Sequence, residues 1–328
     1  MKTPKYWRRD HQSVLPMLLT PLSKVYGWID QINRRSVTTR FVDIPVICIG
    51  NLVAGGAGKT PVAIAIAQFL IKTGLKVHFL SRGYGGTEAG PLRVVADVHT
   101  AKEVGDEPLL LATVAPAWIS KDRFAGAKSA ADAGADVIIM DDGFQNRSLQ
   151  KDLSFVVIDG GFGFGNGKLL PAGPLRELPE KGLLRADALI VIGETEDIYV
   201  PDSLSIPTYK AKIVPHALQK ELIGEKVVAF AGIGRPSKFF QSLRETGADV
   251  IDAVEFPDHH VFSQDDIMKL VEKAALHNAA LVTTRKDYVR LPHDARMMTT
   301  VFDIDLVFDK PSALQKLLSS QLENRLHA

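Results

Sequence analysis

A glycine-rich turn between a predicted strand and a predicted helix decides the fold of this chain. The sequence reads Gly50-Asn51-Leu52-Val53-Ala54-Gly55-Gly56-Ala57-Gly58-Lys59-Thr60-Pro61, directly after the apolar run at residues 44–49. A strand that feeds such a turn, with Lys-Thr opening a helix, is the arrangement that binds the phosphates of ATP or GTP. We therefore predict a nucleoside triphosphate site here.

The residue types of this turn suit phosphate chemistry. We expect the N–H groups that face the phosphates to come from Gly55, Gly56, Ala57 and Gly58. Glycine reaches backbone angles that are closed to other residues, so successive N–H groups can point at one anion. Lys59 adds a charge for the β and γ phosphates, and the Thr60 hydroxyl is placed to bind Mg²⁺. The strict G-x-x-x-x-G-K-[ST] pattern has glycine where this chain has Val53, so we predict a variant loop.

Length and composition exclude several classes of protein. The chain has 328 residues, enough for about two domains, and its formal net charge of +1 gives no reason to expect nucleic acid as a partner. The single cysteine, Cys48, excludes a disulfide framework and favours a reducing compartment. We find no run of about 18 apolar residues and no secretory signal, so we expect a chain that does not cross a membrane.

The first 40 residues predict an amphipathic helical segment. Apolar residues recur there at spacings of three and four, at Leu15, Leu18, Leu19, Leu22, Val25, Tyr26 and Ile29. Basic residues surround this stripe, at Lys2, Lys5, Arg8, Arg9, Lys24, Arg34, Arg35 and Arg40. Pro16 and Pro21 indicate two short helical pieces rather than one rod. Such a stripe suits an anionic membrane surface, and it equally suits packing on the rest of the protein, so the sequence leaves both open.

The next part of the chain alternates between predicted strands and helices. A helix is expected at residues 60–72, ending at Gly74, and further helices at 108–114 and 123–133. Strands are expected at 77–80, 92–95, 118–120, 137–140 and 155–158. This order predicts an α/β fold of the P-loop NTPase type, with a mainly parallel sheet flanked by helices. Ligands of such sheets gather at the carboxyl ends of the strands.

Polar clusters fall at those ends. Asp141 and Asp142 follow an apolar strand and are candidates for holding Mg²⁺ directly or through water. Asp106 and Glu107 open a predicted helix, where they are helix-capping residues or catalytic ones. Arg123 is a surface charge or a phosphate clamp.

A long glycine-rich segment, residues 161–177, follows the strand at 155–158. Its length and composition predict an active-site rim that can move. From about residue 210 the sequence pattern changes, and we expect a smaller C-terminal α/β domain. The expected domains are therefore an N-terminal segment at 1–40, a P-loop core at 41–210 and a C-terminal domain at 211–328 that contributes to the active-site cleft. Within the last domain, His259 or His260 is expected to act beside a carboxylate, because adjacent histidines point in different directions.

Seven motifs occur in an order that resembles the tetraacyldisaccharide 4′-kinase family, the lipid A 4′-kinases of Gram-negative bacteria. They are Gly58-Lys59-Thr60-Pro61, Ser81-Arg82-Gly83-Tyr84-Gly85, Gly105-Asp106-Glu107-Pro108, Lys121-Asp122-Arg123, Asp141-Asp142-Gly143-Phe144-Gln145, Pro174-Leu175-Arg176-Glu177 and Phe256-Pro257-Asp258-His259-His260. With the N-terminal segment and Thr284-Arg285-Lys286-Asp287, they cover most of the chain.

The resemblance implies a kinase at the cytoplasmic face of the inner membrane. Such an enzyme uses ATP and Mg²⁺ and phosphorylates the 4′-hydroxyl of a lipid-linked glucosamine disaccharide, with no obligate protein partner evident. By resemblance, Asp106 accepts the proton of the sugar hydroxyl and His259 supports it. Lys59 and the metal ligands, Thr60 and Asp142, then stabilise the transferred phosphate.

Further roles follow from the same resemblance. Arg123, Arg176 and Glu177 would stabilise charge or bind substrate. Tyr84 and the N-terminal helices would hold the disaccharide and its acyl chains. Asp141 and Glu107 are the less certain metal or water ligands.

The residues alone also suit two other classes of function. One is an ATPase switch at a membrane surface, although such switches carry a further lysine early in the loop, where this chain has Ala54. The other is a soluble kinase for a small metabolite. Transfer of labelled phosphate from ATP to the lipid separates these classes.

Overall fold

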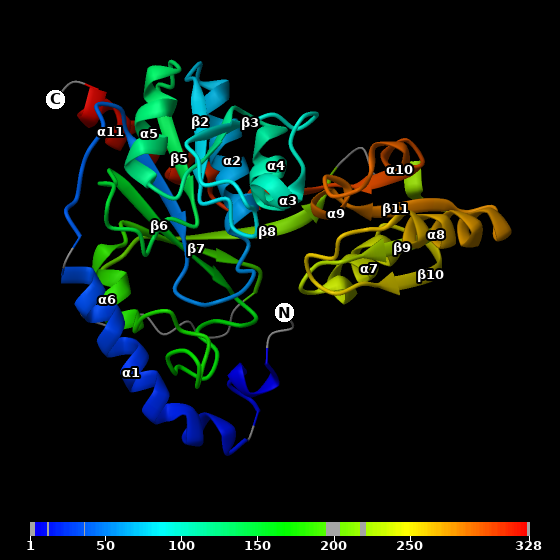
Figure 1. Cartoon of the computed structure of the whole chain (residues 1–328), viewed down its shortest axis with the longest axis horizontal. Coiled ribbons are helices and arrows are strands. Elements are labelled where there is room, and N and C mark those ends of the chain that lie inside the picture. The colour runs from blue at the N-terminus through cyan, green and yellow to red at the C-terminus, as the bar shows by residue number, and fades with distance from the viewer. Residues whose placement is uncertain (1–3, 12, 36, 195–203, 217–220, 327–328) are drawn as a thin grey trace.

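The strands form two separate sheets, which divide the molecule into two units (Figure 1). The computed structural model describes residues 4–11, 13–35, 37–194, 204–216 and 221–326. Within these residues the first sheet has nine strands, in the spatial order β13 (Ile304–Phe308), β8 (Thr208–Pro215), β7 (Ala188–Ile192), β6 (Leu153–Asp159), β1 (Val46–Gly50), β5 (Val137–Asp141), β2 (Val77–Ser81), β4 (Ala117–Ile119) and β3 (Leu92–Val94). Neighbouring strands run parallel except at the two edges, where β3 and β13 are antiparallel to their partners.

Helices cover both faces of the first sheet. One face packs against α2 (Lys59–Lys72), α4 (Asp106–Ala112) and α11 (Pro311–Leu326). The other packs against α5 (Arg123–Asp132) and η2 (Leu183–Arg185), with the short α6 (Pro179–Gly182) before η2. The short α3 (Ala101–Val104) precedes α4. Every residue of β1, β2, β5 and β7 is buried, because both faces are covered. The α/β fold predicted from the sequence, with its mainly parallel sheet, is confirmed.

The second unit contains a four-stranded parallel sheet within residues 226–302. Its order is β10 (Asp249–Glu255), β9 (Lys226–Ala231), β11 (Ala280–Thr284) and β12 (Thr299–Phe302). The helix α7 (Pro236–Glu245) covers one face, and α8 (Gln264–Leu276) covers the other. Two short helices, α9 (Arg285–Tyr288) and α10 (His293–Met297), connect β11 to β12.

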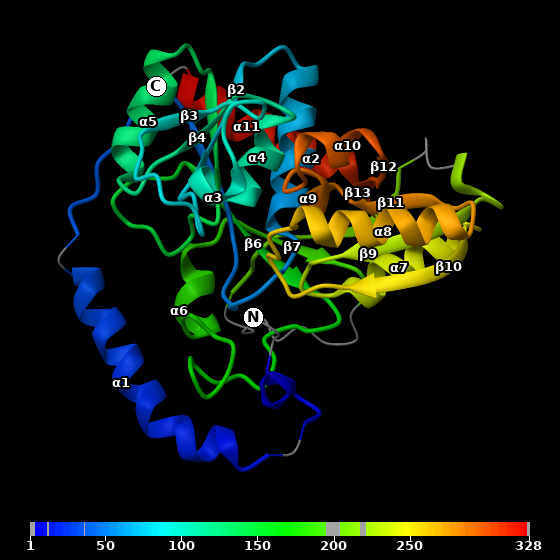
Figure 2. The ribbon, with the colours of Figure 1, turned by 45° about the vertical axis from the view of Figure 1, so that its right-hand side comes forward.

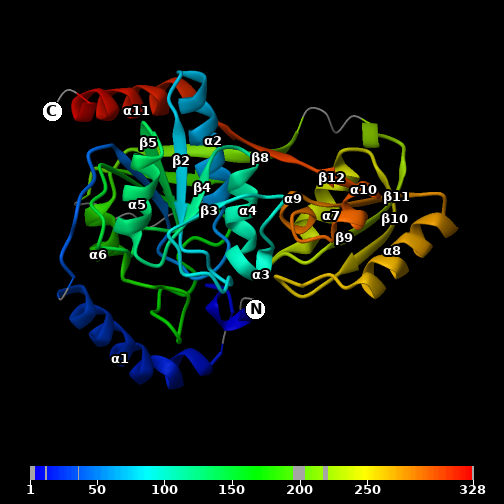
Figure 3. The ribbon, with the colours of Figure 1, turned by 45° about the horizontal axis from the view of Figure 1, so that its top comes forward.

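The C-terminal end of the chain returns to the first sheet, which differs from the expected domain of residues 211–328. Strand β13 pairs antiparallel with β8, and both belong to the first sheet (Figure 3). The physical reason is a stripe at four-residue spacing on α11, where Leu314, Leu318 and Leu322 are buried in the core beside α2. The second unit is therefore an insertion between two paired strands of the first.

The N-terminal segment forms one helix, α1 (Leu15–Arg35), rather than the two short pieces expected. Pro16 stands in its first turn, where no N–H partner is lost, and Pro21 removes only one bond from a 21-residue helix. The helix lies along the outer edge of the molecule (Figure 2). A single turn, η1 (Lys5–Trp7), precedes it. Lys2 and the side chains of Arg34 and Arg35 lie outside the described residues.

We expect Leu318→Ala to destabilise the first sheet, because a cavity replaces a side chain with no exposed surface. Cys48 in the central strand β1 is fully buried, and burial raises the pKa of its thiol to about 11, so thiol labelling reports the opening of this sheet. A loss of about 2–5 kcal/mol predicts labelling at least about 30-fold faster in mild denaturant. The control is Leu276→Ala, on α8 and 80% exposed. Equal labelling rates in the two variants would place α11 outside the first core.

Candidate active site

The turn after β1 has the backbone of a phosphate loop. Gly55 and Gly58 have φ of 118° and 83°, a region that favours glycine, and Gly58 precedes the first residue of α2. Gly56 borders open space, since a Cβ added there would meet no heavy atom within 4 Å. The first N–H groups of α2 have no partner inside the helix. Together these features leave room and donors for an anionic chain of phosphates.

Val53, the departure from the strict motif, has a structural explanation. Its side chain is buried, and its backbone forms an isolated antiparallel bridge with Leu175. The N–H of Ala54 donates to the carbonyl of Pro174 at 2.7 Å. The segment predicted as an active-site rim is therefore bonded directly to the phosphate loop.

Two aspartates at the end of β5 contact the residues that open α2. The Thr60 hydroxyl donates to Asp141 Oδ2 at 2.9 Å, and Lys59 Nζ lies 3.7 Å from Asp142 Oδ1. Arg176 donates to both oxygens of Asp142, at 2.9 and 3.3 Å. These groups meet because β1 and β5 are parallel neighbours, whose carboxyl ends share one edge of the sheet.

The pKa values of the two adjacent carboxyl groups, Asp141 and Asp142, are shifted in opposite directions. Burial, together with the charge of Glu107, raises the pKa of Asp141 to about 7. Burial also disfavours the charged form of Asp142, but Lys59 and Arg176 outweigh it and hold the pKa of that carboxyl below its usual range. Asp141 Oδ1 is buried without a hydrogen-bond partner. An orphaned carboxylate oxygen beside a threonine hydroxyl fits a divalent cation.

Asp106 lies at the start of α4, in contact with a histidine of the second unit. His259 Nδ1 is 3.0 Å from Asp106 Oδ2, and the side chain of Asp106 is only 7% exposed. Gly105, not Asp106, occupies the N-cap position, and Asp106 Oδ1 accepts from the N–H of Glu107 at 3.1 Å. Asp106 therefore satisfies one N–H of the first turn through Oδ1, while its Oδ2 faces the second unit.

Two further cations of the second unit face the same carboxylate. Lys286 Nζ lies 3.5 Å from Asp106 Oδ2 and 3.7 Å from Glu107 Oε1, and Arg290 Nε lies 3.8 Å from Asp106 Oδ2. Burial alone would raise the pKa of Asp106. The hydrogen bond with His259 and the charges of Lys286 and Arg290 outweigh burial and hold that pKa well below its usual range. Asp106 is therefore ionised at neutral pH.

The two adjacent histidines have different surroundings. His259 has φ of 61°, in the left-handed region, and its N–H donates to the carbonyl of Gly232 at 3.0 Å. His260 instead lies 3.0 Å from Asp266 Oδ2, in the capping box of α8, and stacks on Phe256 with ring centroids 4.7 Å apart. His259 faces Asp106, and His260 supports the second unit.

Arg123 is not a surface charge. It is 4% exposed, and its Nη1 donates to the carbonyl of Ser120 at 2.6 Å, while its Nε is buried without a partner. Burial, with a smaller effect of the Arg82 charge, lowers the pKa of Arg123 to about 10. Its neighbour Asp122 caps α5 and pairs with Arg40. A buried guanidinium with an unused donor suits an anionic ligand.

Glu177 and Tyr84 lie in different settings. The Glu177 carboxylate is buried, accepts from Arg185 Nη2 at 2.8 and 2.9 Å, and lies 3.3 Å from Gln145 Nε2. Its contacts favour a structural role for it beneath the rim. Tyr84 is 77% exposed, and its backbone oxygen lies close to Gly105, the residue before α4.

The charged groups form one continuous cluster. Helix α4 contacts α2 on one side and α9 on the other, and the three lie together in Figures 1 and 2. Glu107 provides the electrostatic link, because its charge acts on Asp141 while its carboxylate lies near Lys286. Lys59 and Asp106 therefore belong to the same site.

The chain matches the family model described as tetraacyldisaccharide-1-P 4′-kinase over residues 15–323. It belongs to this family. A relative from Paramagnetospirillum magneticum, named tetraacyldisaccharide 4′-kinase, is 51% identical over 97% of this chain and 98% of its own length. One of the same name from Rhodospirillum centenum is 47% identical, covering 99% and 98%. The crystal structure of LpxK from Aquifex aeolicus, in complex with ATP, superposes with a TM-score of 0.76 at 26% identity, covering 94% of this chain and 99% of that one.

The family expected from the seven motifs is thereby confirmed, and with it the kinase activity. Sequence reasoning assigned no role in the site to two basic residues of this kinase, Lys286 and Arg290. The available signal was the apolar run at 279–282, which indicates a strand whose carboxyl end lies just before Lys286. What the sequence cannot reveal is that this strand end faces α4.

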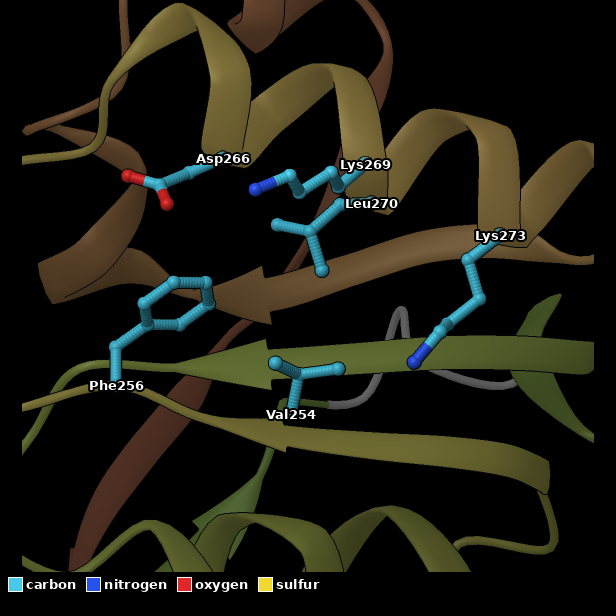
Figure 4. A pocket seen from close by; sticks show the side chains of 6 residues that line it. All are labelled: Val254, Phe256, Asp266, Lys269, Leu270 and Lys273. Atoms are coloured by element: carbon cyan, nitrogen blue, oxygen red, sulfur yellow. The ribbon is translucent and has the colours of Figure 1, made fainter.

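Two open pockets are lined by residues outside the charged cluster. One, of about 270 Å³, lies between β10 and α8, with Phe256 and Asp266 at one end and Lys273 at the other (Figure 4). The other, of about 190 Å³, lies between α1 and the glycine-rich segment, beside Ser23 and Leu169. Neither is lined by a residue predicted for catalysis.

We expect substitution of one histidine to affect stability and substitution of the other to affect activity. His260→Ala should lower the melting temperature with kcat retained, while His259→Ala should lower kcat with the melting temperature retained. Loss of kcat in both variants, with melting temperatures unchanged, would contradict the division.

Asp266 adds a test by pH. Hydrogen bonds from Ser263 and His260 lower its pKa to about 2, from 3.8 in the unfolded chain. A lowered folded-state pKa stabilises the fold above about pH 4 and ceases to do so as pH falls toward 2. Asp266→Asn should therefore destabilise the protein at pH 7 and have little effect near pH 2, as urea titrations at several pH values would measure. A constant difference across this range would contradict the assignment.

Proposed function

We propose that this chain transfers the γ-phosphate of ATP to the 4′-hydroxyl of a tetraacylated glucosamine disaccharide 1-phosphate, the precursor of lipid A. The observation that carries the proposal is the junction of a phosphate loop with an ionised aspartate–histidine pair, linked through Glu107. A phosphate loop alone serves many reactions. A carboxylate held ionised beside it is what an incoming alcohol requires.

The residues at the end of β5 fit Mg²⁺. Thr60 and Asp141 would hold the ion, with Asp142 and Glu107 as further oxygen donors directly or through water. The unpartnered Asp141 Oδ1 supports this assignment. When bound, Mg²⁺ neutralises charge on the phosphates. Among the described residues, no group of three or more His, Cys, Asp or Glu side chains is arranged to hold a metal ion.

Lys59 and Arg176 neutralise charge on the transferred phosphate. Both are cations held against Asp142, and Lys59 is the more loosely held, at 3.7 Å against 2.9 Å for Arg176. The Lys59 side chain is 10% exposed, so a phosphate bound at the loop would meet a cation largely shielded from water. Arg123, buried with an unused Nε donor, is assigned to an anionic group of the nucleotide or the disaccharide.

Asp106 accepts the proton of the sugar hydroxyl, and His259 orients it. The Asp106 carboxylate is a weak base because the hydrogen bond with His259 and the charges of Lys286 and Arg290 stabilise its ionised form. A loose transition state suits a weak base, since the hydroxyl proton leaves late, when the oxygen already bonds phosphorus. Tyr84, an exposed residue, is assigned to contact the sugar.

The kinetic effects of two substitutions test these roles. Lys59→Ala should abolish detectable turnover. Asp106→Asn should lower kcat by roughly 100- to 10,000-fold, the range for a proton acceptor, with the KM for ATP nearly unchanged. The measurement is transfer of labelled phosphate from ATP to the lipid disaccharide. Label that appears only as free phosphate in the wild type would favour the ATPase switch, and unchanged kcat in Asp106→Asn would refute the assigned acceptor.

Helix α1 is proposed to lie on the cytoplasmic face of the inner membrane. Its apolar side chains point away from the protein, with exposed fractions of 76% at Met17, 72% at Leu18 and 65% at Trp28. Ser23, by contrast, is buried against the carbonyl of Leu169. An apolar row that the protein leaves uncovered fits a lipid surface better than the packing alternative. Among the described residues, no helix has the length and apolar character to cross a bilayer.

Vesicle binding tests this orientation. Leu18→Glu/Leu22→Glu should reduce co-sedimentation with vesicles of anionic phospholipid by at least about tenfold, since each lost apolar contact is worth about 1.5–3 kcal/mol. Activity on a detergent-solubilised substrate should remain. Leu276→Glu, an equally exposed leucine of the second unit, is the matched control and should bind vesicles as the wild type does. Equal binding by all three proteins would contradict the proposed surface.

A further inference from the structure

Lys286 is fixed in the second unit by a buried clamp. The Thr284 hydroxyl donates to Asp287 Oδ2 at 2.7 Å and accepts from the Asp287 N–H at 3.1 Å. Asp287 is completely buried and also accepts from the Gly232 N–H at 3.0 Å and from Arg290 at 2.6 Å. The backbone on both sides of Lys286 is thus held in place, and its side chain crosses to α4 of the first unit.

The Lys286 ammonium stands between two carboxylates. It lies 3.5 Å from Asp106 Oδ2 and 3.7 Å from Glu107 Oε1, within ion-pair distance of both. The same oxygen of Asp106 faces His259 Nδ1 at 3.0 Å. Two adjacent carboxylates at one helix end repel each other, and a cation between them fixes their separation.

Arg290 differs from Lys286 in what it binds. Its guanidinium is 4% exposed and donates to Asp287 and to the carbonyls of Gly232 and His260. Arg290 Nε lies 3.8 Å from Asp106 Oδ2, farther than Lys286 Nζ at 3.5 Å or His259 Nδ1 at 3.0 Å. Arg290 therefore braces the turn that carries His259. Lys286, 27% exposed and without such backbone bonds, is the group whose contacts lie on the catalytic side.

We infer that Lys286 is a positioning residue for phosphoryl transfer, which holds Asp106 and Glu107 apart and in register with the phosphate loop. Because Lys286 belongs to the second unit, the acceptor carboxylate is correctly placed only while α9 lies against α4. This inference rests on the proposed function, since it assigns to Lys286 the orientation of the group that accepts the hydroxyl proton.

The test compares Lys286→Gln, which removes the charge, with Lys286→Arg, which keeps it. Lys286→Gln should lower kcat by roughly 10- to 100-fold, the cost of misplacing a reacting group by about 1 Å, with the KM for ATP within about twofold of the wild type. Lys286→Arg should recover kcat to within about fivefold, because an ion pair through a longer cation is retained. The control is Lys269→Gln on α8, for which kcat should equal that of the wild type.

A double variant separates positioning from general stability. In the Asp106→Asn background, adding Lys286→Gln should change kcat by less than about twofold, since the group it positions has lost its function. An additional loss as large as in the wild-type background overturns the inference, as does wild-type kcat in Lys286→Gln. Should Lys286→Gln not fold, Lys286→Arg decides, and a loss beyond about tenfold in that variant overturns the role. Failure of the wild-type protein to phosphorylate the lipid would contradict the proposed function instead.

Discussion

The arrangement of this kinase depends on one buried carboxylate at the junction of its two units. Asp106 belongs to the first unit, and the basic side chains within 4 Å of it, those of His259, Lys286 and Arg290, all belong to the second. An ionised carboxylate removed from water is strongly unfavourable unless it is paired and hydrogen-bonded. The second unit therefore keeps Asp106 charged, and Asp106 in turn draws the turn with His259 toward α4.

A second pair of carboxylates shows how the sheet divides two roles between adjacent residues. Asp141 ends β5 and is fully buried beside Thr60, while Asp142 turns toward Lys59 and Arg176. The turn requires φ of 50° at Asp142, just as the catalytic turn requires φ of 61° at His259. Left-handed backbone at residues other than glycine costs about 1–3 kcal/mol and persists where the surroundings enforce it. At both positions the backbone conformation directs a side chain toward the proposed site.

The topology explains how the second unit stays close to the first. The chain leaves the first sheet through β8 and returns through β13, and these strands are paired. Helix α11 then packs on the core beside α2, the helix that follows the phosphate loop. The inserted unit is thus connected to the first sheet at two adjacent points. These connections restrict the positions that α9 can take relative to α4.

The sequence by itself determined the phosphate loop, the α/β alternation and the identity of the acidic motifs, because local spacing and strand ends specify them. It also predicted Asp106 and His259 as partners through the resemblance to a kinase family, and the two side chains lie 3.0 Å apart. The tertiary structure alone shows that His259 contacts Asp106 while His260 contacts Asp266. It alone revealed that the last strand and helix belong to the first sheet and that Lys286 faces Asp106. Contacts between residues 180 positions apart depend on how the two units pack, and no local pattern encodes that packing.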